Sequence, residues 1–206
     1  MKRKRRACCC GPEWFEESGF LVIKESDLEE DWESKLSESF VGEGDNATVH
    51  TISVFGKEYA LKCRKDAASL EKLIMRFRVQ KQIHDIDGVL VDEGVLLRSG
   101  GVIDPKMTLQ QKLPNEAKQL ADLKDDAEEE KVKEIGKQIM KEVHARNVVH
   151  RDLSHHNIMT IPGSDPPKVW IIDWDEAQAD CCDAGPKAEI PKGKHKKHQK
   201  PNLYTT

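Results

Sequence analysis

Residues 38–64 place the tightest constraint on the fold. They read ESFVGEGDNATVHTISVFGKEYALKCR and contain three runs rich in β-branched and aromatic residues, 38–42, 47–55 and 58–64. A Gly-rich turn and a Gly-Lys turn separate these runs, as is typical of adjacent antiparallel strands. The segment therefore predicts an antiparallel meander and commits this part of the chain to a β-sheet.

Helical and strand patterns alternate after the meander. Apolar residues recur near helical spacing over 67–85, and 88–114 supply two further strands with a turn at 99–101. Residues 126–146 predict a long helix with acids early and basic residues late, as the helix dipole prefers. A short buried strand follows in KVWIIDWDEA, 168–177. The chain is therefore predicted to be α+β.

Length and composition limit the protein class. At 206 residues the chain has room for one domain or a small two-lobed one rather than two full domains. No apolar run approaches the roughly 20 residues of a membrane-spanning helix, and the start MKRKRRACCCG lacks the apolar segment of a secretory signal. The six cysteines have no disulfide-framework or zinc-knuckle spacing. We therefore expect an intracellular, cytoplasmic protein.

Charge is unevenly distributed along the chain. Residues 2–6 carry five of the 33 basic side chains and 181–206 carry six, so 7–180 hold 22 basic and 35 acidic ones. The basic start beside Cys8–Cys10 is compatible with a palmitoylated, peripheral membrane contact, with nuclear import, or with a plain solvated tail. Nucleic-acid binding is not favoured, because no aromatic residues are interleaved with the basic ones. Residues 13–38 predict short ordered pieces without an assigned role.

The loop VVHRDLSHHNIM concentrates polar residues between apolar flanks. It holds five residues at fixed spacing: His150, Arg151, Asp152, Leu153 and Asn157. A polar loop that caps a helix would contain an aspartate and an asparagine by itself. In this order of elements, however, the loop resembles the catalytic loop H-R-D-L-x-x-x-N of the protein kinase superfamily. The resemblance covers roughly residues 40–180.

The resemblance implies a two-lobed protein kinase-like fold. A β-rich N-lobe would span 38–115, a reduced α-helical C-lobe 116–180, and ATP·Mg would lie in the cleft between them. The remaining parts are an extension over 1–37 and a basic tail over 181–206. The resemblance also makes Asp152 the catalytic base and Asn157 a ligand of Mg²⁺.

Asp173 takes the place of the aspartate of the family's D-F-G motif. In WIIDWDEA, Trp174 stands for the phenylalanine and Asp175 for the glycine. By resemblance Asp173 binds Mg²⁺, because phosphoryl transfer needs oxygen ligands for the metal beside an acidic acceptor for the incoming hydroxyl. The expected cofactors are therefore ATP and Mg²⁺.

The segment VGEGDNATV, 41–49, resembles the family's Gly-rich loop. Gly42 and Gly44 would let backbone amides approach phosphate oxygens, and Val49 takes the place of the valine that ends the pattern. YALKC resembles V-A-I-K and places Lys62 on the next strand, where it would reach the α- and β-phosphates. These four residues are the expected nucleotide contacts of the N-lobe.

Two further segments resemble the family less closely. Glu71 follows Lys62 by only nine residues, and it is either the ion-pair partner of that lysine or an exposed acid in the first turn of a helix. LQQKLPN, 109–115, resembles a hinge segment whose backbone would meet adenine.

The chain departs from ordinary protein kinases after Asp173. Only 33 residues follow, without an A-P-E-like element, and Ser154 replaces the lysine that Ser/Thr kinases carry after the base. The outline is similar to small atypical kinases. The resemblance implies a small, atypical kinase, of Ser/Thr type, that transfers the γ-phosphoryl group of ATP to a hydroxyl on a protein. The alternative is a nucleotide-binding pseudokinase or adaptor that docks a partner protein.

Overall fold

The computed structural model describes residues 11–66 and 69–179, which form two compact units. The first unit runs through Arg78 and includes Val91–Leu113, and the second consists of Val79–Leu90 and the chain from Pro114. The N-terminal basic and cysteine segment and the basic tail lie outside the described residues. The predicted lobe bounds, 38–115 and 116–180, stay predictions. Among the described residues, none of the helices has the length and apolar character needed to cross a membrane.

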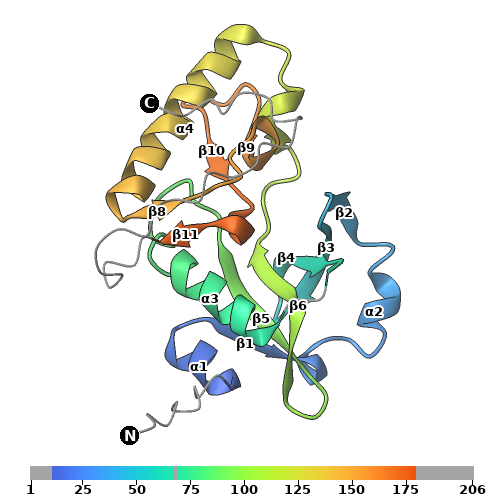
Figure 1. Cartoon of the computed structure of the whole chain (residues 1–206). Coiled ribbons are helices and arrows are strands. Elements are labelled where there is room, and N and C mark those ends of the chain that lie inside the picture. The colour runs from blue at the N-terminus through green and yellow to red at the C-terminus, as the bar shows by residue number, and fades with distance from the viewer. Residues whose placement is uncertain (1–10, 67–68, 180–206) are drawn as a thin grey trace, which may run out of the picture. The chain divides into compact units, whose positions relative to one another are not determined.

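A six-stranded mixed sheet forms the first unit (Figure 1), in agreement with the predicted α+β class. Its strand order is β1-β5-β6-β4-β3-β2, and all neighbours are antiparallel except β1 and β5, which are parallel. The strands are β1 (Leu21–Lys24), β2 (Phe40–Glu43), β3 (Ala47–Val54), β4 (Lys57–Arg64), β5 (Asp92–Arg98) and β6 (Val102–Gln111). The expected meander is β2-β3-β4.

The β3–β4 turn sets the register of this meander. Phe55 and Gly56 have positive φ angles of 51° and 75° and connect the paired residues Val54 and Lys57. Two-residue turns with positive φ at both positions match the twist of the flanking strands. The resulting register places Lys62 directly opposite residue 49.

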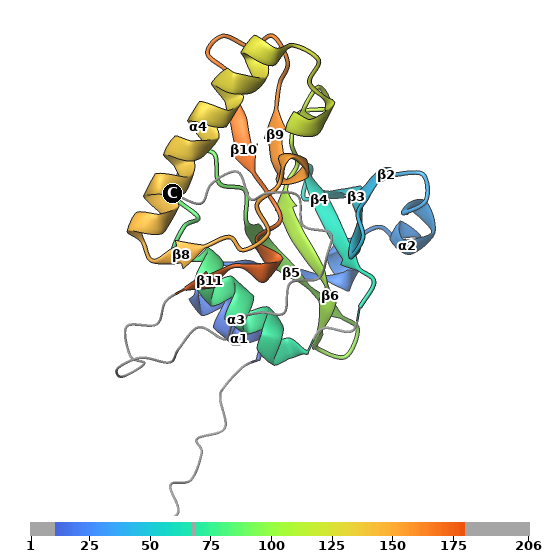
Figure 2. The same ribbon diagram turned by 45° about the horizontal axis from the view of Figure 1, so that its top comes forward.

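Helices cover both faces of this sheet. α1 (Pro12–Glu17) and α3 (Leu70–Gln80) pack on one face, and α2 (Trp32–Lys35) contributes to the core on the other. Figure 2 shows α1 beside α3 and α2 apart from both. The α3-side cluster contains Phe15, Leu73, Ile74, Phe77, Val95 and Ile103. The α2-side cluster contains Ile23, Trp32, Ile52, Val54, Tyr59, Leu61, Leu96 and Leu109.

Strand β1 gives a structural role to a segment for which the sequence suggested none. It pairs with β5 so closely that a Cβ at Gly94 would lie 2.5 Å from the backbone oxygen of Leu21. Only glycine allows this approach, so Gly94 is required for the addition of the edge strand.

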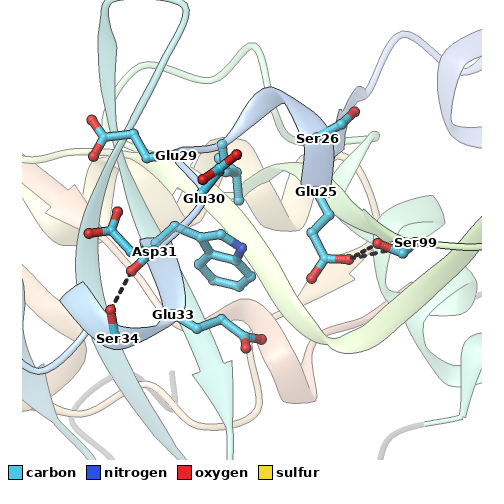
Figure 3. A pocket seen from close by; sticks show the side chains of 10 residues that line it. Glu25, Ser26, Glu29, Glu30, Asp31, Glu33, Ser34 and Ser99 are labelled. Atoms are coloured by element: carbon cyan, nitrogen blue, oxygen red, sulfur yellow. Dashed lines mark hydrogen bonds between the residues drawn. The ribbon is translucent and has the colours of Figure 1, made fainter.

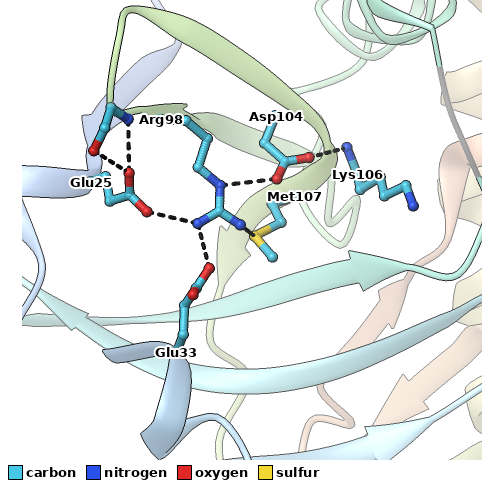
Figure 4. Close-up of polar contacts among 7 residues, drawn as sticks. Glu25, Glu33, Arg98, Asp104, Lys106 and Met107 are labelled. Atoms are coloured by element: carbon cyan, nitrogen blue, oxygen red, sulfur yellow. Dashed lines mark hydrogen bonds and ion pairs between the residues drawn. The ribbon is translucent and has the colours of Figure 1, made fainter. Parts of the chain in front are cut away.

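On the α2 side, Arg98 connects β5 to the N-terminal segment (Figure 4). Its Nη1 donates to Glu25 and Glu33, and its Nε donates to Asp104 at 3.1 Å. The guanidinium lies over the ring of Trp32, 5.1 Å from the ring centroid. This cluster fixes η1 (Glu25–Asp27) and α2 to the β5–β6 hairpin.

The second unit consists of one long helix and short paired strands. α4 spans Asp126–Ala145, within one residue of the prediction, and Asp125 caps it by accepting a 2.8 Å hydrogen bond from the Glu128 amide. Figure 1 shows α4 alongside β10, against which it packs. The other elements are β7 (Lys118–Gln119), η2 (Leu120–Asp122), β8 (Val148–Val149), η3 (His155–Asn157), β9 (Ile158–Thr160), β10 (Val169–Ile171), η4 (Trp174–Glu176) and β11 (Gln178–Ala179). The sheets are β10-β9-β7 and β11-β8.

Helix α3 ends at Gln80, before the predicted limit of 85. Successive turns follow, in which the amides of Ile83 and Ile86 bond to the carbonyls three residues before them, and both isoleucines are buried. The helical spacing of these apolar residues is therefore satisfied by turns. Arg146, after α4, bonds to Asp85 and to the carbonyl of Gln82, which holds these turns in the second unit.

Candidate active site

The predicted catalytic loop is a compact, internally bonded structure in the second unit. Asn157 Nδ2 donates to the backbone oxygen of Asp152 at 2.8 Å and to its Oδ2 at 3.4 Å. The Asp152 side chain is exposed, and Asn157 is half-buried. Asn157 therefore orients a carboxylate that a dissolved hydroxyl compound can reach.

His150 anchors the beginning of this loop. It is 1% exposed, its Nε2 lies 2.8 Å from the carbonyl oxygen of Ile172, and its Nδ1 accepts a 3.3 Å hydrogen bond from the Asp152 amide. Burial lowers the pKa of His150. Its ring therefore serves as a neutral bridge between residues 152 and 172.

Asp173 directly follows this bridge. It has a left-handed backbone conformation, φ 62° and ψ 60°, and the side chain of the next residue, Trp174, is buried. The Trp174 ring lies 4.4 Å from the His150 ring, and its Nε1 donates to the Ile171 carbonyl at 3.0 Å. The tryptophan that replaces the family's phenylalanine thus fixes the backbone at Asp173.

Pairing of β9 with β10 links Asp173 to the catalytic loop. These strands are antiparallel, and the Ile172 amide donates to the Asn157 carbonyl at 3.0 Å. The structure therefore brings Asp152, Asn157 and Asp173 into one connected segment of the second unit.

The donor set of this segment fits Mg²⁺. Both hydrogen bonds from the Asn157 side chain to Asp152 use Nδ2, so its Oδ1 takes no part in them. Mg²⁺ in nucleotide sites keeps several waters and takes one or two protein oxygen ligands beside phosphate oxygens. Across residues 11–66 and 69–179, no cluster of three or more His, Cys, Asp or Glu side chains suits a metal. The fit therefore depends on one amide, one carboxylate and the phosphates themselves.

The predicted nucleotide contacts of the first unit lie in one row across the sheet. Gly42 pairs with Val49, Val49 with Lys62, and Lys62 with Thr108. Directly opposed residues on neighbouring strands share a face of the sheet. Lys62 is 7% exposed, unlike a solvated edge lysine. The structure thus brings Gly42, Val49 and Lys62 together on one surface.

Packing within the protein does not require glycine at the two glycine positions of the predicted Gly-rich loop. A Cβ at Gly42 would meet no atom within 4 Å, and one at Gly44 would lie 3.9 Å from the nearest atom, the Ala47 oxygen. The loop is closed by a 2.9 Å bond from the Gly44 amide to that oxygen. The space above Gly42 is therefore open to a ligand.

Glu71 does not lie in the buried part of α3. It is an exposed acid in the first turn of the helix, and its pairing with Lys62 stays a prediction. Arg76, also on α3, forms an ion pair with the sheet, and its Nη1 lies 3.8 Å from Oδ2 of Asp92. No sequence motif indicated Asp92, whose only sign was an acid within an apolar strand pattern.

A hollow of about 700 Å³ lies elsewhere in the first unit (Figure 3). Its lining is mostly acidic or hydroxyl-bearing: Glu25, Ser26, Leu28, Glu29, Glu30, Asp31, Trp32, Glu33, Ser34 and Ser99. Five glutamates and aspartates repel a triphosphate. None of the predicted nucleotide contacts lines this hollow, so it is distinct from them.

Comparison with known proteins supports the kinase resemblance. Residues 87–184 match the RIO domain. The chain is also 27% identical over 172 residues to the 3-deoxy-D-manno-octulosonic acid kinase of Vibrio cholerae serotype O1, an alignment that covers 82% of this chain and 69% of that protein. Asp152, Asn157 and Asp173 lie inside the RIO match. The predicted resemblance to the protein kinase-like superfamily is thereby confirmed, and it is carried by the segment 87–184, which matches the RIO domain.

Proposed function

We propose that this protein is an ATP-dependent phosphotransferase that moves the γ-phosphoryl group from ATP·Mg to a hydroxyl. One observation carries the proposal: Asn157 bonds through its side chain to Asp152 and through its carbonyl to the amide next to Asp173. A single residue thus fixes the proposed base and the second proposed metal ligand. Such positioning is the main contribution of a protein to phosphoryl transfer.

The second unit supplies the chemistry in this proposal. Asp152 orients the acceptor hydroxyl and takes its proton as the new O–P bond forms, while the bond between the γ-phosphorus and the β–γ bridging oxygen breaks and ADP leaves. Asn157 and Asp173 would hold Mg²⁺, which would neutralise charge on the phosphate oxygens. His150 and Trp174 keep the backbone of both segments in place.

The first unit supplies nucleotide contacts. Lys62 binds the α- and β-phosphates, and the amides around Gly42 and Gly44 approach phosphate oxygens without a Cβ in the way. Val49 lies beside Lys62 in the sheet and packs against the adenine ring of ATP. The exposed Glu71 stays a candidate partner for Lys62.

The acceptor is proposed at the level of a hydroxyl compound. A protein hydroxyl is the acceptor that the kinase resemblance implies. The name of the Vibrio cholerae relative is that of a sugar-acid kinase, so a sugar hydroxyl is the second acceptor class to test. Both classes meet the same requirement, a hydroxyl beside an exposed carboxylate.

Nucleotide binding gives the first test. ATP with Mg²⁺ should raise the melting temperature of the full chain, because a ligand at 100 times its Kd stabilises the folded state by about 2.7 kcal/mol. Lys62→Ala and Asp173→Ala should each reduce this shift. Lys133→Ala, which removes ion pairs to Glu129 and Glu130 on α4, is the matched control and should keep it.

Two outcomes would count against the proposal. Equal ATP·Mg shifts in wild type, Lys62→Ala and Asp173→Ala would remove those residues from the site. A normal shift without phosphoryl transfer to any protein or sugar acceptor would favour the pseudokinase or adaptor alternative.

A further inference from the structure

A buried polar network on the α3 side of the sheet centres on Asp92, which is 0% exposed. Its Oδ1 accepts from the Thr108 hydroxyl at 2.9 Å and from Gln110 Nε2 at 3.0 Å. Its Oδ2 accepts from Arg64 Nη2 at 3.3 Å and lies 3.8 Å from Arg76 Nη1. The network therefore joins β4, β5, β6 and α3 through one carboxylate.

This network adjoins Lys62. Thr108 is the direct cross-strand partner of Lys62, and Arg64 follows Lys62 by two residues, so its side chain lies on the same face of β4. The Thr108 hydroxyl accepts from Arg64 Nη1 at 3.0 Å while it donates to Asp92. The side chains beside Lys62 are thus held by directional bonds.

The network also holds α3 against the sheet. α3 also makes apolar contacts, from Leu73, Ile74 and Phe77 to Val95 and Ile103. Apolar packing is not directional. It therefore fixes the distance between α3 and the sheet more strongly than the position of α3 along the sheet. The pair between Arg76 Nη1 and Asp92 Oδ2, 3.8 Å apart, adds an electrostatic attraction between this helix and one particular point of the sheet, while Glu71 is exposed.

Stability alone does not account for such a network. Buried ion pairs contribute little net stability, because the cost of desolvation offsets the attraction, and apolar replacements are often as stable. Their best-supported benefit is a defined position for the groups that they join. In this protein the network defines the positions of β4, the strand that carries Lys62, and of α3.

We infer that Asp92 is a positioning residue, which acts through Arg64, Thr108 and Arg76 to hold Lys62 against the phosphates of ATP. This inference rests on the proposed function, because it assigns the contact of Lys62 with phosphate to a network rather than to Glu71. Asp92 itself does not touch the nucleotide in this account.

The test compares ATP·Mg with adenosine as ligands of the full chain. By titration calorimetry, Asp92→Asn should raise the Kd for ATP·Mg roughly tenfold, in the range of coupled neighbouring residues. The Kd for adenosine should change less than about twofold, because adenosine has no phosphate for Lys62. In a Lys62→Ala background, Asp92→Asn should have little further effect on ATP·Mg binding.

Arg98→Gln is the matched control. It removes a partly buried arginine with several acidic partners from the opposite face of the same sheet (Figure 4). It should lower the melting temperature while both Kd values stay as in wild type. If Asp92→Asn does not fold, Thr108→Val replaces it, because this isosteric change removes the bridging hydroxyl and keeps every charge.

The remaining outcomes overturn the inference in distinguishable ways. Equal weakening of ATP·Mg and adenosine would show a general structural role, and unchanged binding of both would show no role. An additive loss in the Lys62→Ala background would separate Asp92 from Lys62. Absence of ATP·Mg binding in wild type would instead reject the proposed function, and this inference with it.

Discussion

At Asn157, different atoms of one residue have different partners. Nδ2 donates to Asp152, and the backbone carbonyl accepts from Ile172. Oδ1, the kind of oxygen that Mg²⁺ prefers, is outside these bonds. The left-handed conformations of Arg151 and Asp173, on either side of this residue, are sparsely populated for non-glycine residues and cluster at functional sites.

Glu25 gives a prediction about pH at the same scale. Hydrogen bonds from the Ser99 hydroxyl and amide, and then from Arg98, lower the pKa of Glu25 from 4.5 to about 2. Because the folded pKa is the lower one, the ionised carboxylate stabilises the fold above pH 4.5, and this contribution is lost as the pH falls toward 2. Glu25→Gln should therefore lower the free energy of unfolding at pH 7, with a difference from wild type that shrinks below pH 4.5. Urea unfolding at pH 7, 5, 4 and 3 measures this difference, and a constant value would contradict it.

At the scale of elements, glycine is needed at two strand positions for different reasons. Gly94 has a neighbouring strand where its Cβ would be, whereas Gly42 has open space. The first therefore serves the addition of β1 to the sheet, and the second serves ligand access in the proposed site.

Alanine at these two positions should separate stability from binding. Gly94→Ala should lower the free energy of unfolding by about 1–3 kcal/mol, because the added methyl group forces β1 and β5 apart. It should leave the relative increase in melting temperature with ATP·Mg unchanged. Gly42→Ala should change stability by less than about 0.5 kcal/mol and reduce that increase. Urea unfolding and thermal melts of both variants measure the two effects, and a reversed pattern would refute the assignment.

The sequence predicted the elements whose signals are local. The strands β3 and β4 and the helix α4 begin and end within one or two residues of their predicted limits, because their turns, caps and periodicity lie within each segment. The role of β1 was not predicted, since it depends on the close approach of Gly94 far along the chain. The hydrogen bonds between Asp152 and Asn157 are short-range in sequence. In the Asp92 network, Arg64 lies 28 positions from Asp92, so no local sequence pattern could predict the contact.

At the scale of the whole molecule, the proposed functional residues are divided between the two units. The first holds Lys62 and the Gly-rich loop, and the second holds Asp152, Asn157 and Asp173. The chain passes between the units after Arg78, after Leu90 and after Leu113, and the last of these points lies inside the segment 109–115 that resembles a hinge. The RIO match begins at residue 87, so it covers the whole proposed catalytic segment but not the Gly-rich loop or Lys62.

Transfer of labelled γ-phosphate tests the central claim most directly. Wild type and Asp152→Asn are incubated with γ-labelled ATP, Mg²⁺, and either cell protein or a mixture of sugar acids, and the labelled product is measured over time. Asp152→Asn should lower the transfer rate roughly 10²- to 10⁴-fold, because it removes the proposed base, while the increase in melting temperature with ATP·Mg is kept. Equal transfer rates in the two proteins would contradict a catalytic role for Asp152 and the phosphotransferase site built around it.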